Sequence, residues 1–166
     1  AHYAHIRETG QLPSEDLLPL TFVNAAFWMI PTDVLRTVGG FCPLFYHYGE
    51  DKDFVNRLTY HNYQVGFSPK VFGNHDREYR PMTHQGFLRT EYVYHLSEYA
   101  NIRFHWLKAF GYGVLAPIKK ALVALLKGRA SLSKDYFHMT FQLLRRSKEV
   151  CFYRKTNRSS NPHYIQ

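Results

Sequence analysis

The sequence predicts an α/β fold, with a small mixed sheet and helices over residues 1–80 and a mostly helical half over residues 81–166. Short β-branched and aromatic runs bounded by Gly and Pro predict the strands of the first half. Glycines next to apolar helical patterns mark the helix ends there. After Pro81 the apolar residues recur at helical spacing, which predicts the second half. With 166 residues, 45% of them apolar and 17% aromatic, the chain is long enough to bury a sizeable core.

A strand and a short helix are expected after a leading loop or short helix over residues 1–20. Residues 21–30 are rich in β-branched and aromatic side chains, which is typical of a buried strand. Pro31 then opens a helix that continues through Val38. We expect this helix to end at Gly39, because glycine tolerates the left-handed conformation of a helix C-cap.

A second helix is expected to begin after Gly49. Its first turn carries three acidic residues, Glu50, Asp51 and Asp53. Its apolar face is formed by Phe54, Val55 and Leu58. Two short extended segments follow over residues 63–67 and 70–74, separated by Ser68 and Pro69.

The second half reads as a series of helices. Thr83 is a suitable N-cap for a long helix. Its apolar positions at helical spacing are Leu88, Tyr92, His95, Tyr99, Trp106 and Phe110. Further helices are expected over residues 114–127 and 133–148. Residues 154–166 show no period, so we expect them to be frayed.

The charge of the chain is divided unevenly between its two halves. Residues 1–76 hold 5 Lys and Arg against 8 Asp and Glu, whereas residues 77–166 hold 16 against 5. The basic half is expected to attract anionic partners such as lipid headgroups or phosphorylated substrates. The longest apolar run, residues 114–126, contains 13 residues and two lysines. Since a helix needs about 20 apolar residues to cross a bilayer, we expect no membrane span.

The acidic first turn of the second helix is the first candidate for chemistry. Backbone N–H groups and the helix dipole favour ionised carboxylates at this position, and an ionised carboxylate accepts a hydroxyl proton. Simple helix capping explains the same acids. Their neighbours in the chain favour the chemical interpretation.

Residues 20–80 resemble the acceptor-side half of family 2 glycosyltransferases of the GT-A fold. The similarity lies in five motifs that follow one another in the family's order. They are Asn24-Ala25-Ala26-Phe27-Trp28, Val38-Gly39-Gly40-Phe41, Phe45-Tyr46-His47-Tyr48-Gly49-Glu50-Asp51, Arg57-Leu58 and Asn74-His75-Asp76. Ala25 departs from the family, which usually has glycine at this position.

The resemblance implies a role for each of these positions. Asp51 would be the catalytic base that deprotonates the acceptor hydroxyl, and Glu50 would position the acceptor. His75 would complete the site of a divalent cation, Mn²⁺ or Mg²⁺, that holds the nucleotide diphosphate. Substrate binding is assigned to Asn24, Ala25, Trp28 and Arg57, although an aromatic residue such as Trp28 belongs more often to the core.

The same resemblance implies that the GT-A domain is truncated in this sequence. Asp51-Lys52-Asp53 spells an Asp-x-Asp motif, but the family's metal-binding motif ends a strand of the donor half, whereas this one opens a helix. We therefore expect a piece of a longer protein, an inverting glycosyltransferase that acts on a glycan or lipid-linked acceptor of the cell envelope. Its partner would be a nucleotide-diphosphate sugar, and the isolated piece would be inactive.

Two alternatives concern the basic helical half. In the first, it is a non-enzymatic module that docks to an anionic membrane or a partner protein. In the second, its apolar stripe packs against the catalytic core or a second subunit and the lysines are solvated. A nucleic-acid partner is not expected, because no known binding motif accompanies the charge. We also expect the chain to self-associate through the apolar edge that would be exposed where the missing donor half would pack.

The two cysteines, Cys42 and Cys151, match no metal or redox spacing and are expected to be ordinary buried residues with reduced thiols. This pattern fits a cytoplasmic protein. Peripheral contact at the inner face of the cell membrane is expected in addition.

Overall fold

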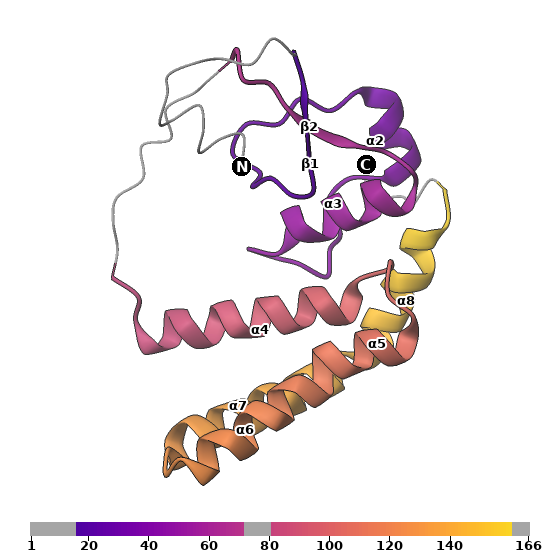
Figure 1. Ribbon diagram of the computed structural model, residues 1–166. Helices are drawn as coiled ribbons and strands as arrows, with labels where there is room; N and C mark the ends of the chain where they lie inside the picture. Colours follow the sequence, from indigo (N-terminus) through magenta and orange to yellow (C-terminus); the bar gives the residue numbers. More distant parts are fainter. Residues whose placement is uncertain (1–15, 72–80, 161–166) are drawn as a thin grey trace.

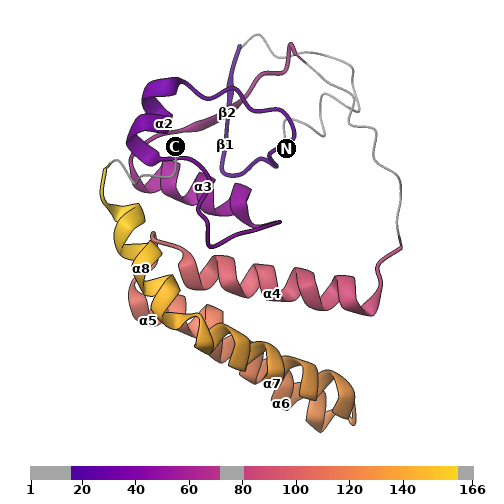
Figure 2. The same ribbon diagram turned by 180° about the vertical axis from the view of Figure 1, so that it is seen from behind.

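A computed structural model describes residues 16–71 and 81–160 of the chain. Figure 1 shows a small α/β part above a set of helices, and Figure 2 shows the same arrangement from behind. In the α/β part, β1 (Leu18–Leu20) pairs antiparallel with β2 (Val65–Phe67), with Leu18 opposite Phe67. The helices α2 (Thr32–Val38) and α3 (Glu50–Tyr60) pack beside this pair.

The expected helices of the first half are confirmed, and so is the extended segment at β2. The sheet of the described residues has two antiparallel strands rather than a mixed arrangement. A two-stranded sheet does not identify a GT-A topology, which therefore stays a prediction. Of the segment expected over residues 70–74, residues 72–74 lie outside the described part of the chain.

The strand expected over residues 21–30 is wrong. These residues are mostly exposed and irregular, and their backbone makes a local hydrogen bond, from Ala26 N–H to Asn24 O at 2.8 Å. A strand needs a neighbour for its backbone groups, and the described strands pair only with each other. Instead, Trp28 and Ile30 pack against the apolar cluster of α2 and α3.

Arg57, in the last turn of α3, ties this helix to the turn that ends α2. Its side chain is 0% exposed, and Nε donates to Asp53 Oδ2 at 2.8 Å. The two terminal nitrogens donate to Val38 O and Gly40 O, each at 2.7 Å. The carbonyls at the end of α2 are thereby tied to α3, and Gly39 between them has the positive φ of 82° that favours glycine.

The second half is helical, as expected. It contains α4 (His84–Ala100), α5 (Trp106–Phe110), a π-helical turn η1 (Gly111–Leu115), α6 (Ala116–Leu126), α7 (Ala130–Arg145) and α8 (Ser147–Arg158). Thr83 caps α4 as predicted, because its Oγ1 accepts from the Gly86 N–H at 3.0 Å.

The long helix expected from Thr83 to Phe110 is interrupted at residues 101–105. The Asn101 side chain accepts from the Arg103 N–H at 3.0 Å, which forms a turn in place of a helical bond. Arg154 of α8 donates to the carbonyls of Tyr99 and Phe104 on either side of this break, at 3.1 and 2.7 Å, and also to that of Asn101. A buried guanidinium from a distant part of the chain thus donates hydrogen bonds to the carbonyls at the break in the helix.

The frayed segment expected from residue 154 onward is wrong for its described part. Residues 154–158 complete α8, and the Arg154 and Asn157 side chains are 4% and 1% exposed. The carbonyls that Arg154 binds lie 50 to 55 positions earlier in the chain, and His61, which contacts the Asn157 carbonyl, lies 96 positions earlier. No local pattern therefore predicts the end of this helix. Residues 161–166 lie outside the described part.

The π-helical turn packs closely against α4. A Cβ added at Gly113 would lie 2.4 Å from Tyr99 Cβ, so only glycine fits at this contact. The neighbouring Tyr112 carbonyl accepts from His95 Nδ1 at 2.7 Å. A π-helical turn displaces carbonyls from the regular ladder, and here a buried imidazole takes one of them.

The two cysteines differ from one another. Cys42 is buried as expected, and burial, with a smaller contribution from the charge of Asp53, raises the pKa of its thiol to about 11. Cys151 is exposed on α8, so the expectation that it is buried is wrong. The buried side of α8 is formed by Val150, Arg154 and Asn157, and Cys151 does not lie on this side.

Candidate functional site

The candidate site lies at the N-terminus of α3, and Gly49 determines how this helix begins. Gly49 has a φ of 90°, and a Cβ at this position would lie 2.9 Å from Phe45 Cδ1 and from Val93 Cγ1 of α4. The helix start therefore lies directly against α4. A larger residue would have to move it away, so the first turn has little positional freedom.

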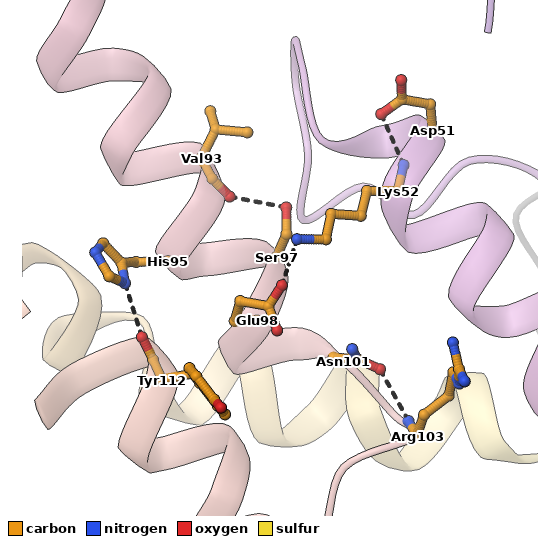
Figure 3. Close-up of polar contacts among 9 residues, drawn as sticks. All are labelled: Asp51, Lys52, Val93, His95, Ser97, Glu98, Asn101, Arg103 and Tyr112. Atoms are coloured by element: carbon orange, nitrogen blue, oxygen red, sulfur yellow. Dashed lines mark hydrogen bonds and ion pairs between the residues drawn. The ribbon is translucent and has the colours of Figure 1, made fainter. Parts of the chain in front are cut away.

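Asp51 points away from this packed side. Its Oδ1 accepts from the Lys52 N–H at 2.7 Å, and the carboxylate makes no other hydrogen bond within the described residues. Figure 3 shows the Lys52 side chain directed to Glu98 of α4, whereas the Asp51 carboxylate points in another direction. Asp51 is half-buried, so part of its side chain remains exposed at the surface.

Glu50 beside it is also half-buried, but its carboxylate is partly removed from water. Its Oε2 is buried and has no hydrogen-bond partner in the described segments. A buried acceptor without a donor is costly, typically about 1–3 kcal/mol, and such atoms need an explanation. A hydroxyl or amide of a bound acceptor would supply the missing donor.

Asp53 has a different environment from Asp51, two residues away. It is 4% exposed and bound to Arg57. Burial raises its pKa, and the charge and hydrogen bond of Arg57 oppose the rise. Because this carboxylate is directed into the protein, Asp51-Lys52-Asp53 does not present two carboxylates to one ligand, which agrees with setting aside the Asp-x-Asp motif.

Arg57, expected to bind substrate, is inaccessible in this structure. Its side chain is hydrogen-bonded to Asp53 and to the carbonyls of Val38 and Gly40. A contact with substrate would require it to leave these partners. The expected direct role is therefore corrected to a positioning role, in which Arg57 holds α3 against the Gly39 turn.

The other three residues expected to bind substrate, Asn24, Ala25 and Trp28, are divided between surface and core. Asn24 and Ala25 are exposed. The Trp28 ring lies 5.6 Å from that of Phe54 and 6.3 Å from that of Phe41, so it belongs to the apolar cluster, as its residue type suggested. Its indole N–H is buried and has no partner among the described residues.

A cavity of about 300 Å³ lies between the irregular segment and α3. It is lined by Thr21, Phe22, Lys52, Val55 and Asn56. The Asn56 Nδ2 is buried and makes no hydrogen bond within the described residues. The structure thus brings residues 21–22 to the helix that carries the acidic pair, although neither Asn24 nor Asp51 lines the cavity itself.

Lys52 and Asn56 were not identified from the sequence as site residues. The signal for Asn56 was present, since it is an amide on the otherwise apolar face formed by Phe54, Val55 and Leu58. Lys52 carried no such signal, because its position above α4 depends on the packing of the two helices.

The metal site cannot be located among the described residues. His75 lies outside them. In the ranges 16–71 and 81–160 no group of three or more His, Cys, Asp or Glu could hold a metal ion. The expectation of Mn²⁺ or Mg²⁺ therefore stays attached to His75.

A second group of polar side chains crosses the helical half. Glu91 of α4 binds Lys120 of α6, accepts from the Tyr136 hydroxyl at 2.9 Å and lies 4.0 Å from His95 Nε2. Burial raises the pKa of Glu91, but the hydrogen bonds of Lys120 and Tyr136 outweigh it, and the pKa is lowered overall. For His95, burial lowers the pKa despite the bond to the Tyr112 carbonyl.

Comparisons of the chain with protein-family models, curated proteins and solved structures gave no match. The resemblance to family 2 glycosyltransferases therefore rests on the motifs themselves.

Proposed function

We propose that this chain is the C-terminal, acceptor-side portion of an inverting glycosyltransferase. The enzyme would transfer a sugar from a nucleotide-diphosphate donor to a hydroxyl of a glycan or lipid-linked acceptor. The observation that carries the proposal is the acidic start of α3, where Asp51 points away from the helix packing and Glu50 has an unpartnered buried oxygen.

Asp51 acts as the general base in this proposal. Its carboxylate lies in the first turn of α3, where the helix dipole favours the ionised form by about 0.3–1 kcal/mol. As the acceptor oxygen attacks the anomeric carbon, its proton passes to the carboxylate and the diphosphate leaves from the opposite face. General base catalysis of this kind contributes about 100- to 10,000-fold to the rate.

Glu50 orients the acceptor beside the base. Its buried Oε2 accepts a second hydroxyl of the acceptor, which holds the reacting hydroxyl towards Asp51. Arg57 and Gly49 contribute indirectly, because they keep the first turn of α3 in place.

The donor lies outside the described residues in this proposal. A divalent cation at His75 would neutralise the leaving diphosphate. Since His75 is not described, no step above depends on the cation. For the isolated chain we expect weak or no binding of uridine diphosphate, and tight binding would contradict a donor site shared with another segment.

The test is Asp51→Asn in the full-length protein, with release of nucleoside diphosphate measured over a panel of nucleotide sugars and acceptors. Asparagine keeps the Oδ1 that accepts from Lys52, so the fold is expected to be unchanged. We expect turnover to fall about 100- to 10,000-fold. Asp33→Asn is the matched control, because Asp33 occupies the first turn of α2 and is exposed.

Near-normal turnover of Asp51→Asn would refute the base assignment. An equal loss in Asp33→Asn would attribute the effect to helix capping rather than to chemistry. Glu50→Gln is expected to raise KM for the acceptor more than it lowers kcat, because its role is positioning.

A further inference from the structure

The helical half has an apolar surface that nothing in the described structure covers. It consists of exposed side chains on two neighbouring helices, and we call it the hairpin face. Its residues are Leu115, Leu122, Leu126 and Val123 on and just before α6, and Phe137, Phe141 and Leu144 on α7. In both views α6 and α7 run side by side on the far side of α4 from the sheet, as the outer layer of the helical half (Figures 1 and 2).

The helix that contains α6 is apolar on both its inner and its outer side. Its inner side buries Val114, Pro117, Ala121 and Ala124 in the core. On the outer side Leu115, Leu122 and Leu126 are 53%, 50% and 88% exposed. A helix that is apolar on two opposite sides belongs in a protein core or in contact with lipid, and the outer side of this one lies outside the core.

The length of this helix was underestimated from the sequence. α5, the π-helical turn and α6 join into one helix, Trp106–Leu126, of 21 residues, which is long and apolar enough to cross a membrane by length and composition. Only 33% of its apolar stretch is buried within the protein. The helix is therefore longer than the one expected over residues 114–127.

Contacts of the inner side argue against a spanning orientation. The Lys120 ammonium binds Glu91, and the Tyr112 carbonyl accepts from His95 at 2.7 Å. A span would break both contacts. It would also place Lys119 and Lys120 near the middle of the bilayer, at a cost of about 2.5–3.5 kcal/mol each.

Basic side chains border the hairpin face. Lys119, Lys127, Arg129, Lys134 and Arg145 are exposed. None of them has a carboxylate partner in the part of the chain that the structure describes. Residues 101–160 hold 13 Lys and Arg against two Asp and Glu. The face therefore combines apolar area with a surplus of positive charge.

The position of one lysine distinguishes a lipid surface from a second copy of the chain. Lys119 lies between Leu115 and Leu122 in the exposed apolar stripe of α6. Protein interfaces exclude lysine from their buried centre. At a bilayer surface, however, a lysine extends its ammonium to the headgroups while its stem stays in the apolar layer.

We infer that the hairpin face binds the surface of an anionic lipid bilayer. The helix Trp106–Leu126 and α7 lie in the plane of the headgroups, and the leucines and phenylalanines enter the acyl boundary. The basic residues contact the anionic headgroups, and the α/β part with Asp51 stays on the aqueous side. This inference does not depend on the proposed catalytic function.

The test is co-sedimentation of the full chain with two kinds of vesicle, phosphatidylcholine alone and phosphatidylcholine with an equal part of phosphatidylglycerol. We expect binding to the anionic vesicles that fades as salt is added, since exposed charges are screened. Leu122→Gln/Leu126→Gln is expected to weaken this binding at least about tenfold, because two apolar side chains no longer leave water.

Two controls match these changes. Met29→Gln removes a fully exposed apolar side chain from the α/β part and should leave binding unchanged. Lys119→Glu/Lys127→Glu should weaken binding by about fivefold or more for each lysine, whereas Lys155→Glu on α8 should have little effect. All of the replaced side chains are exposed, so none of these changes alters a core contact. The circular dichroism spectra of the variants should therefore match that of the parent chain.

Two results would overturn the inference. One is that the chain sediments equally with neutral and with anionic vesicles, or that Leu122→Gln/Leu126→Gln sediments with anionic vesicles as well as the parent chain does. The other is a dimer in light scattering that becomes a monomer in Leu122→Gln/Leu126→Gln while neither protein binds vesicles. That second outcome would make another copy of this chain the occupant of the face.

Discussion

Replacing Arg57 by methionine tests whether the start of α3 depends on a buried cation. The change keeps much of the side-chain volume but removes the donors to Asp53, Val38 O and Gly40 O. Removing one partner of a buried ion pair typically costs about 3–5 kcal/mol, because the other charge is left without compensation. We therefore expect Arg57→Met to lower the free energy of unfolding by about 3–5 kcal/mol at neutral pH.

The pH dependence of this loss identifies its cause. Burial raises the pKa of Asp53, and Arg57 opposes the rise, so removing Arg57 raises this pKa further. A folded-state pKa above the ordinary value means that the folded protein binds more protons than the unfolded one. The stability of Arg57→Met is therefore lost as pH rises from the ordinary value of 3.8 through the higher folded value.

The assay is urea unfolding followed by circular dichroism, at neutral pH and in mild acid. Arg57→Met should lose less stability in acid than at neutral pH. Arg57→Met/Asp53→Leu should be more stable at neutral pH than Arg57→Met alone, since it no longer buries an unpaired carboxylate. A loss below about 1 kcal/mol, or a loss equal at the two pH values, would refute this reasoning.

Three other predictions concern the helix contacts. Gly49→Ala should lower the free energy of unfolding by about 2–4 kcal/mol, because residue 49 has a φ of 90° and its Cβ would lie 2.9 Å from two side chains. Gly128→Ala is the control, since residue 128 has a φ of 70° but open space around it. It should lower the free energy of unfolding by only about 1 kcal/mol in the same urea assay. Gly113→Ala should lower Tm by several degrees, because its Cβ would lie 2.4 Å from a carbon of α4. Gly111→Ala, with nothing within 4 Å, should raise Tm slightly. Equal effects of the two changes would contradict the close packing of the π-helical turn. Burial lowers the pKa of His95 below its ordinary value of 6.5, so its contribution to stability is complete above that pH and is lost as pH falls below it. His95→Gln should flatten the acid side of the curve of urea midpoint against pH, and an unchanged slope would exclude His95 as its source.

The features that the sequence predicted correctly depend on local signals. Thr83 capped α4 as expected, since an N-cap bonds within its own first turn. Gly39 has a positive φ at the end of α2, where a glycine C-cap was expected, and α3 begins directly after Gly49 as predicted. The acids of the first turn of α3 also lie where local pattern placed them.

The features that the sequence did not predict depend on contacts between distant residues. Residues 21–30 have strand-like composition but no neighbouring strand in the described structure. Asn101 interrupts a helical pattern, and the cation that takes up the free carbonyls, Arg154, comes from α8. Arg57 belongs to an expected substrate motif, yet its partners make it part of the core.

The sequence by itself determined α2, α3 and the start of α4, the cap at Thr83 and the position of an acidic pair at a helix start. Each of these depends on backbone bonds and side chains within one or two turns of chain. Only the tertiary structure decided that Asp51 faces outward while Asp53 and Arg57 face inward, and that the leucines of α6 remain uncovered. These outcomes depend on which surfaces meet when the helices pack, and a linear pattern of residue types does not specify that.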